Sequence, residues 1–144
     1  MAGKGTVSIN GTAASNVEVK SEYDKTDPNI RLVAGDENYL ELSGFKADQG
    51  RFFSNEENES GRKVAVIGPD IVKKLFPGGK PIGQYISVNG LRYQVVGTVQ
   101  SRGSIMGMSQ DNLVFIPLQT ARADYPSFTS FTVSVVPPEG LTAA

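Results

Sequence analysis

The sequence predicts an α+β fold made mostly of short β-strands with two or three short helices. β-branched and aromatic residues recur in short blocks, and Gly, Pro, Asn and Asp separate the blocks. Helical spacing of apolar residues is confined to short windows. With 144 residues the chain has the length of one ordinary domain with a buried core.

The first strands are predicted near the N-terminus. Residues 6–9 and 16–23 have strand composition, and Asn10-Gly11 between them is a turn signal. Residues 21–29 are polar and contain a proline, so we expect a loop or a frayed strand end there.

A short helix is expected after a strand at residues 30–33. Asp36 is suited to cap residues 37–42, because its side chain can accept hydrogen bonds from free backbone N–H groups. Gly44 can close the helix in a left-handed conformation.

Residues 47–62 form an acidic, polar segment. We expect Phe52 and Phe53 to anchor it and the rest to lie on the surface. Its carboxylates lack the ordered Asp, Asn and Gly spacing of a calcium loop, so a solvated surface is favoured over a cation site. The carboxylates considered are Asp48, Glu56, Glu57 and Glu59.

Residues 64–67 are four apolar residues in a row, as in a strand covered on both faces. A short amphipathic helix is predicted next. Pro69 tolerates the first helical position because its N–H is missing anyway, and Asp70 complements the helix dipole.

The stretch from Val64 to Gln84 resembles a glycine-rich phosphate loop at first sight. A phosphate loop needs its glycines between strand and helix, followed by Lys and Ser or Thr. Here the glycines follow the predicted helix, and Pro69 has no N–H to donate. The stretch therefore predicts no nucleotide site.

The clearest local signal is Asn89-Gly90, which lies between alternating strand residues within 86–99. Asn-Gly is the preferred pair for a two-residue type I′ hairpin. In that register Ile86 faces Tyr93 across the strands, on a face turned toward the core.

The C-terminal part predicts strands at residues 113–116 and 131–136 and a helical turn at 117–122. Residues 101–111 are expected to form a flexible loop. Its large apolar residues suit an adaptable protein contact, or they tuck under the loop as a small satellite core. The residues considered for partner contact are Ile105, Met106 and Met108.

The composition excludes several function classes. Lys and Arg total 14 and Asp and Glu total 15, so no net positive field favours nucleic acid. The chain has no Cys and no His, which removes thiol nucleophiles, imidazole bases and the usual zinc ligands. Ser60 and Lys63 are close in sequence, but no motif marks them as catalytic. We predict no catalytic residue, no metal site and no cofactor.

Six sequence segments, in this order, resemble the MacB-like periplasmic core domain of FtsX-like ABC transporter permeases. Each segment alone is weak evidence, but the shared order is specific. The resemblance covers about residues 35–136. The segments are Gly50-Arg51-Phe52-Phe53, Val64-Ala65-Val66-Ile67-Gly68, Leu75-Phe76, Pro81-Ile82-Gly83-Gln84, residues 93–99 and Val114-Phe115-Ile116-Pro117-Leu118.

The resemblance implies a part of a membrane machine. In this family the domain lies between the first two membrane spans on the periplasmic side, and the chain is similar to its small β-rich lobe with adjoining strands. Residues 1–5 are then interpreted as a non-native leader and residues 6–140 as a single extracytoplasmic domain cut from a longer permease. Membrane contact is expected only through spans outside this chain, at the bacterial inner membrane.

The resemblance also implies a function. A separate domain would hydrolyse ATP in the cytoplasm, and this domain would couple that movement to envelope partners in efflux or export. Expected partners are an adaptor or membrane-fusion protein and a second copy of the permease. The first alternative is a cargo-binding or chaperoning domain, as in lipoprotein-releasing permeases. The second is an enzyme that works without His.

Overall fold

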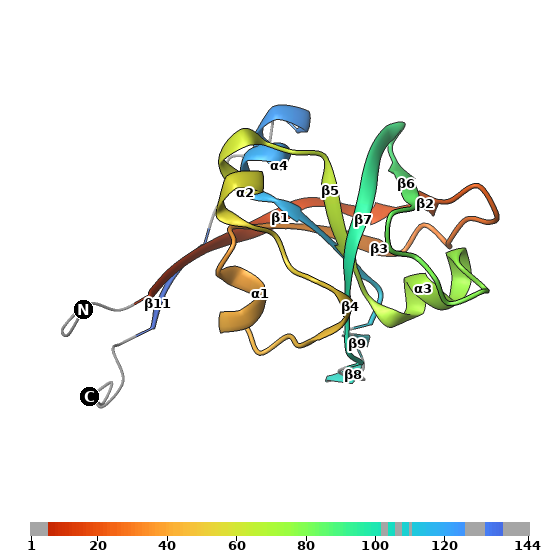
Figure 1. Ribbon diagram of the computed structural model, residues 1–144, viewed down its shortest axis with the longest axis horizontal. Coiled ribbons are helices and arrows are strands. Elements are labelled where there is room, and N and C mark those ends of the chain that lie inside the picture. The colour runs from red at the N-terminus through yellow and green to blue at the C-terminus, as the bar shows by residue number, and fades with distance from the viewer. Residues whose placement is uncertain (1–5, 102–103, 106–107, 110, 126–131, 137–144) are drawn as a thin grey trace.

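The computed structural model describes residues 6–101, 104–105, 108–109, 111–125 and 132–136. It confirms the α+β fold, with four short helices in these ranges where two or three were predicted (Figure 1). The strands are β1 Thr6–Val17, β2 Val19–Lys20, β3 Ile30–Gly35, β4 Ala47–Gly50, β5 Val64–Ile67, β6 Tyr85–Val88, β7 Leu91–Val99, β8 Ser104–Ile105, β9 Met108–Ser109, β10 Leu113–Pro117 and β11 Thr132–Val136. The helices are α1 Tyr39–Leu42, α2 Asn55–Ser60, α3 Pro69–Leu75 and α4 Leu118–Asp124.

Most strands form one sheet in the order β11-β1-β3-β10-β5-β7-β6-β2, with β4 added beside β7. β1 and β2 lie far apart in this strand order, yet only Glu18 separates them in the sequence. Val17 at its end of β1 pairs with Ile30 in β3, and Val19 in β2 pairs with Val88 in β6. The sheet therefore closes into a small barrel, which leaves few strand edges open.

The barrel interior is filled by alternating residues of its strands. β3 directs Leu32 and Ala34 inward, and β6 contributes Ile86 and Val88. α3 and α4 add apolar side chains to the same cluster. The members that are less than 2% exposed are Val19, Leu32, Ala34, Ala65, Ile67, Ile71, Leu75, Ile86, Val88, Tyr93, Val95, Val114, Ile116 and Ala121.

A second apolar cluster covers the outer face of β3, β10 and β5. Val33, Val66 and Phe115 alternate with the interior residues and point outward into it. Phe45 packs edge to face on Phe115, with ring centroids 5.0 Å apart. Because both faces of these strands are covered, their sequences are continuous apolar runs. The buried-strand predictions at residues 64–67 and 113–116 are confirmed.

β7 bends between two sets of neighbours at a bulge. It pairs with β6 through its first half and with β4 near its end, and its register with β5 shifts between Val95 and Gly97. The backbone at Arg51 crosses directly over Gly97, where an added Cβ would lie 1.9 Å from the Arg51 carbonyl oxygen. Only glycine fits at position 97. Close packing therefore explains why the segments 50–53 and 93–99 of the sequence pattern occur together.

The short helix predicted to start at Pro69 and the Asn-Gly hairpin are also confirmed. Pro69 occupies the first turn of α3. Asn89 and Gly90 both have positive φ, as a type I′ turn requires, and Ile86 pairs with Tyr93.

Two predictions for the N-terminal region are wrong. Asn10-Gly11 is not a turn, because β1 runs straight through it and pairs with β3 and β11 there. The short helix begins at Tyr39 instead of residue 37, with Asn38 at its N-cap.

Residues 47–62 are mostly exposed apart from the phenylalanines, as predicted, but the prediction is wrong at two positions. They contain β4 and α2, and Glu57 and Asn58 are buried. Ser54 and Glu57 form a capping box, which starts α2 although the segment is short and acidic.

β1 continues beyond the barrel as one strand of a ribbon with β11. Thr6 pairs with Val136 and Asn10 with Thr132, and this ribbon projects to the left of the body in Figure 1. Within the described residues, none of the helices has the length and apolarity needed to cross a membrane.

Candidate functional site

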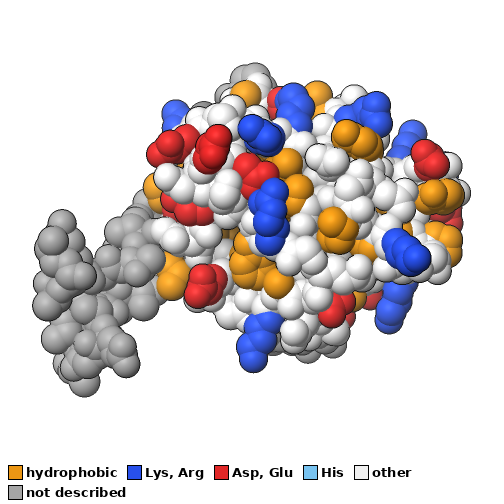
Figure 2. All heavy atoms as spheres, in the orientation of Figure 1, with side chains coloured by type: hydrophobic (Ala, Val, Ile, Leu, Met, Phe, Trp, Pro, Cys, Tyr) orange, Lys and Arg blue, Asp and Glu red, His pale blue; other side chains and the backbone are white. Residues whose placement is uncertain are grey.

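Three large apolar side chains of the described residues are clearly exposed: Tyr23 at 58%, Tyr85 at 48% and Ile82 at 42%. Tyr23 follows β2, Ile82 precedes β6, and Tyr85 is the first residue of β6. On the face seen in Figure 2, hydrophobic side chains lie singly or in small groups among charged ones. The region around β6 is therefore the first candidate for an interaction site.

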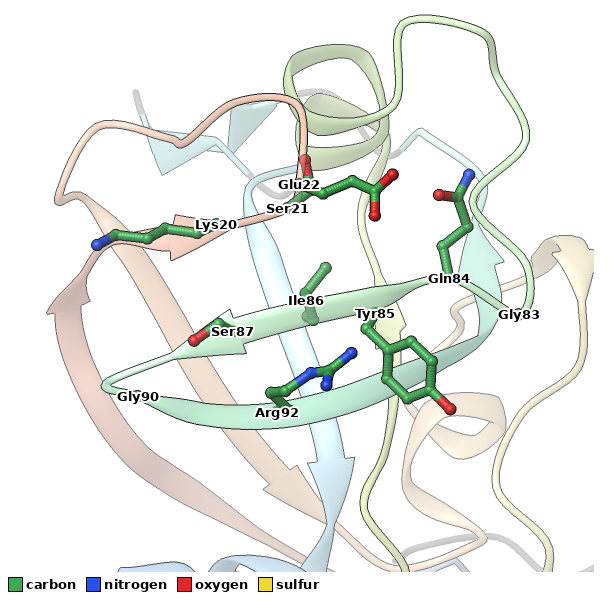
Figure 3. A pocket seen from close by; sticks show the side chains of 10 residues that line it. All are labelled: Lys20, Ser21, Glu22, Gly83, Gln84, Tyr85, Ile86, Ser87, Gly90 and Arg92. Atoms are coloured by element: carbon green, nitrogen blue, oxygen red, sulfur yellow. The ribbon is translucent and has the colours of Figure 1, made fainter.

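The larger of two hollows in this region opens where β2 and β6 separate (Figure 3). It encloses about 560 Å³. β2 ends at Lys20, because Ser21 donates its N–H to the Asp24 carbonyl at 2.9 Å and its hydroxyl to the Leu75 carbonyl at 2.9 Å. These bonds turn the chain away from β6 and leave the hollow between the two segments.

Tyr85 and Arg92 form the outer wall of this hollow. The Arg92 guanidinium lies 4.5 Å from the centre of the Tyr85 ring, within cation–π distance. The two side chains lie beside each other across β6 and β7 in Figure 3. Together they present an aromatic surface that carries a positive charge.

A second hollow of about 340 Å³ adjoins the first, because Gln84 lines both. Tyr23 packs edge to face on Phe76, with 6.5 Å between ring centroids. Lys80 lies on its rim. We call Tyr23, Lys80, Gln84, Tyr85 and Arg92 the β6 surface.

The β6 surface carries two cations that lack a carboxylate partner in the part of the chain that the structure describes. Among the described residues, neither Lys80 nor Arg92 is within ion-pair distance of a carboxylate. Lys74, in contrast, is paired with Asp24 at 3.3 Å. An acidic partner would complement the two unpaired cations.

The predicted contact residues lie elsewhere. Ile105 in β8 pairs with Met108 in β9, so part of the predicted flexible loop forms a two-stranded hairpin. Met106 lies outside the described residues. The structure thus places Ile105 opposite Met108 in the hairpin, and their role in partner contact stays a prediction.

The acidic segment around α2 has a structural role at Glu57. Arg51 donates two hydrogen bonds to its carboxylate, at 2.6 and 3.0 Å, and Ser54 donates its N–H at 3.0 Å. The Arg51 hydrogen bonds lower the pKa of Glu57 from its ordinary value of 4.5 to about 2. The described residues include no cluster of three or more metal-binding side chains.

Ser60 and Lys63 each bind other groups. The Ser60 hydroxyl donates to the Glu56 carbonyl at 2.8 Å, and Lys63 forms an ion pair with Asp124. The other Asp124 oxygen accepts the Tyr93 hydroxyl at 2.9 Å. This arrangement ties α4 to β7 and to the residue before β5, and it does not bring a serine nucleophile to a lysine base.

Comparisons with known proteins agree with the sequence pattern. The MacB-like periplasmic core domain family matches residues 4–144. The macrolide export ATP-binding/permease protein MacB of Azoarcus sp. (strain BH72) is 38% identical over 106 residues, which are 73% of this chain and 16% of that protein. The pyoverdine export ATP-binding/permease protein PvdT of Pseudomonas aeruginosa is 30% identical over 105 residues, or 72% of this chain and 16% of its own.

Solved structures share the fold. The periplasmic region of MacB from Actinobacillus actinomycetemcomitans matches with a TM-score of 0.80 and 17% identity, covering 99% of this chain and 62% of that one. The extracellular domain of the transporter YknZ from Gram-positive bacteria matches with a TM-score of 0.72 and 20% identity, covering 92% of this chain and 65% of the other. The chain thus spans under two thirds of these solved regions and about one sixth of the two curated relatives.

Proposed function

The chain belongs to the MacB-like periplasmic core domain family and is a periplasmic domain of an ABC transporter permease. We propose that this domain couples cytoplasmic ATP hydrolysis to movement and partner contact in the envelope. The observation that carries the proposal is the family match over residues 4–144. The domain is not the ATPase of such a transporter, so its contribution is mechanical. We further propose that residues 6–140 are one domain of a longer permease held at the inner membrane.

The closed barrel supports a mechanical role. A closed sheet resists shear because each strand is hydrogen-bonded on both sides, and a close-packed interior transmits displacement. The clusters inside and outside the barrel share strands β3, β5 and β10. A displacement applied to one strand is therefore passed to both layers.

The β6 surface supports a contact with a second protein. It combines the exposed rings of Tyr23 and Tyr85 with two cations, Lys80 and Arg92, that lack a carboxylate partner among the described residues. Aromatic residues and Arg are enriched at the centres of protein interfaces. The partner that fits is an adaptor or other envelope protein with an acidic, partly apolar surface. The β8/β9 hairpin and a second permease copy are further proposed contacts.

The proposal can be tested in the full-length transporter that carries this domain. Tyr85→Ser combined with Arg92→Ser should reduce export at least fivefold while ATP hydrolysis continues, because the contact is lost and the ATPase is untouched. Lys46→Ser, at an exposed position of the same charge, is the matched control. Normal export by the double variant would refute the contact at the β6 surface.

A second experiment separates coupling from cargo binding. A photo-crosslinking residue at position 105 or 85 should react with an envelope protein during ATP turnover. Reaction with a hydrophobic cargo at position 105 would instead favour the cargo-binding alternative and contradict the mechanical role.

A further inference from the structure

The ribbon of β1 and β11 leaves the barrel at one residue. Asn10 pairs with Gly35 in β3 and with Thr132 in β11. The preceding part of β1, from Thr6 to Ile9, pairs with β11 alone. β3 has ended there, so this part of β1 has lost its neighbour in the barrel.

Asp36, the first residue after β3, replaces that neighbour. Its N–H donates to the Ile9 carbonyl at 3.0 Å, and its carboxylate oxygen Oδ2 accepts the Ile9 N–H at 2.8 Å. Both backbone groups of Ile9 are therefore bound by one residue. The hydrogen-bond ladder between β1 and β3 is continued by one step, with the Asp36 backbone N–H as donor and its carboxylate in place of a backbone acceptor.

The other carboxylate oxygen fixes Asp36 to the next element. Oδ1 accepts the Asn38 N–H at 3.0 Å, at the N-terminal end of α1. The carboxylate thus links the base of the ribbon to α1, and α1 packs through Leu40 into the outer cluster. Burial raises the pKa of Asp36, with Glu37 acting in the same direction and the N–H groups of Ile9 and Asn38 opposing.

A two-stranded ribbon has little stability or fixed direction by itself. If β1 alone joined the ribbon to the barrel at Asn10, the ribbon could pivot against the barrel. The bonds between Ile9 and the Asp36 backbone N–H and carboxylate oppose such a pivot, because rotating β1 breaks both together, and the carboxylate supplies the charge-assisted one.

We propose that Asp36 is a positioning residue that fixes the angle at which the β1/β11 ribbon leaves the barrel. Thr6 and Val136, the outermost described residues, pair at the tip of this ribbon. Movement that enters the domain along the ribbon then turns the barrel instead of bending the junction. This role rests on the mechanical coupling proposed above.

The junction can be tested on the 144-residue chain itself. Because the chain has no cysteine, spin labels can be placed at Ser134→Cys in the ribbon and Lys73→Cys on α3. We expect one narrow distance distribution, and Asp36→Ala should broaden it. Asp48→Ala, at an exposed aspartate of β4, is the matched control and should leave it unchanged.

Amide hydrogen exchange gives a second, local measurement. Asp36→Ala should speed exchange of the Ile9 N–H by roughly tenfold or more, while core amides of β5 keep their protection. Asp36→Asn retains one oxygen acceptor, so it should give an intermediate effect. An unchanged distance distribution together with an unchanged Ile9 rate would overturn the assignment.

The full-length transporter then separates the two proposals. If Asp36→Ala loosens the junction and lowers export per ATP, both are supported. If it loosens the junction without changing that ratio, Asp36 still positions the ribbon, but the coupling role is contradicted.

Discussion

Glu57→Gln tests how far the ion pair between Arg51 and the buried Glu57 of α2 sets the acid stability of the domain. Glutamine keeps an oxygen that can accept the Ser54 N–H, so the cap of α2 can persist. It removes the negative charge that Arg51 binds through two hydrogen bonds. The substitution therefore isolates the charge from the shape.

The magnitude follows from the difference in pKa between the folded and unfolded states. A pKa of about 2 in place of 4.5 for Glu57 corresponds to about 3 kcal/mol of stabilisation at neutral pH. The Glu57 side chain is only 8% exposed, but that of Arg51 is 56% exposed, so solvent screens the pair. We therefore expect about 1 to 2 kcal/mol.

The pH range follows from the same values. Because the folded pKa of Glu57 lies below its ordinary value, the stabilisation is complete above about pH 4.5 and is lost as pH falls toward 2. Urea unfolding at pH 7, 4.5, 3 and 2.5 should show a larger loss of stability in the parent protein than in Glu57→Gln as the pH falls. Glu59→Gln, exposed on the same helix, is the control. Equal pH dependence in parent and Glu57→Gln would refute the reasoning.

Three further substitutions test the packing. Gly97→Ala should lower the free energy of unfolding, measured by urea titration, by about 3 kcal/mol, because the added Cβ would lie 1.9 Å from the Arg51 carbonyl oxygen. An unchanged free energy would show that β7 can shift. Phe115→Ala should cost about 3 to 5 kcal/mol by thermal unfolding, since it empties the centre of the outer cluster, and a loss below 1 kcal/mol would contradict that packing. Tyr93→Phe should cost about 1 kcal/mol by removing the hydrogen bond to Asp124; an unchanged midpoint would mean that this bond does not hold α4.

The parts of the fold that could be predicted depend on local chemistry. Asn89 and Gly90 favour a type I′ turn by their own backbone preferences, and Pro69 marks the start of α3. Asn10-Gly11 carries the same turn signal as Asn89-Gly90, yet pairing of both residues with β3, and of Asn10 also with β11, keeps it extended. Tertiary pairing thus overrides a local preference in one place and agrees with it in the other.

The burial of Glu57 in the acidic segment was harder to predict, because it depends on the direction in which its side chain points. Glu57 and Arg51 are six residues apart, and nothing in composition indicates that α2 turns one carboxylate inward. The Ser54 to Glu57 spacing is the signal that would have found it, since it matches a capping box.

The candidate site was only partly within reach of the sequence. The hairpin register already turns Ile86 and Tyr93 inward, so Tyr85 must face out and Arg92 lies diagonally across from it. Tyr23 could not be added from the sequence, because its place beside Phe76 depends on Ser21 turning the chain away from β6.

The continuity of β1 and β2 also orders the assembly of the domain. Closing the barrel requires Val19 to meet Val88, and the parallel pairing of β3 with β10 spans a still longer stretch of chain. Such distant contacts make for slow folding. During synthesis the barrel can close once β10 has left the ribosome, whereas β11, the ribbon partner of β1, emerges later. Thr6 to Ser8 of β1 therefore stay unpaired until β11 is available, so the ribbon forms after the barrel.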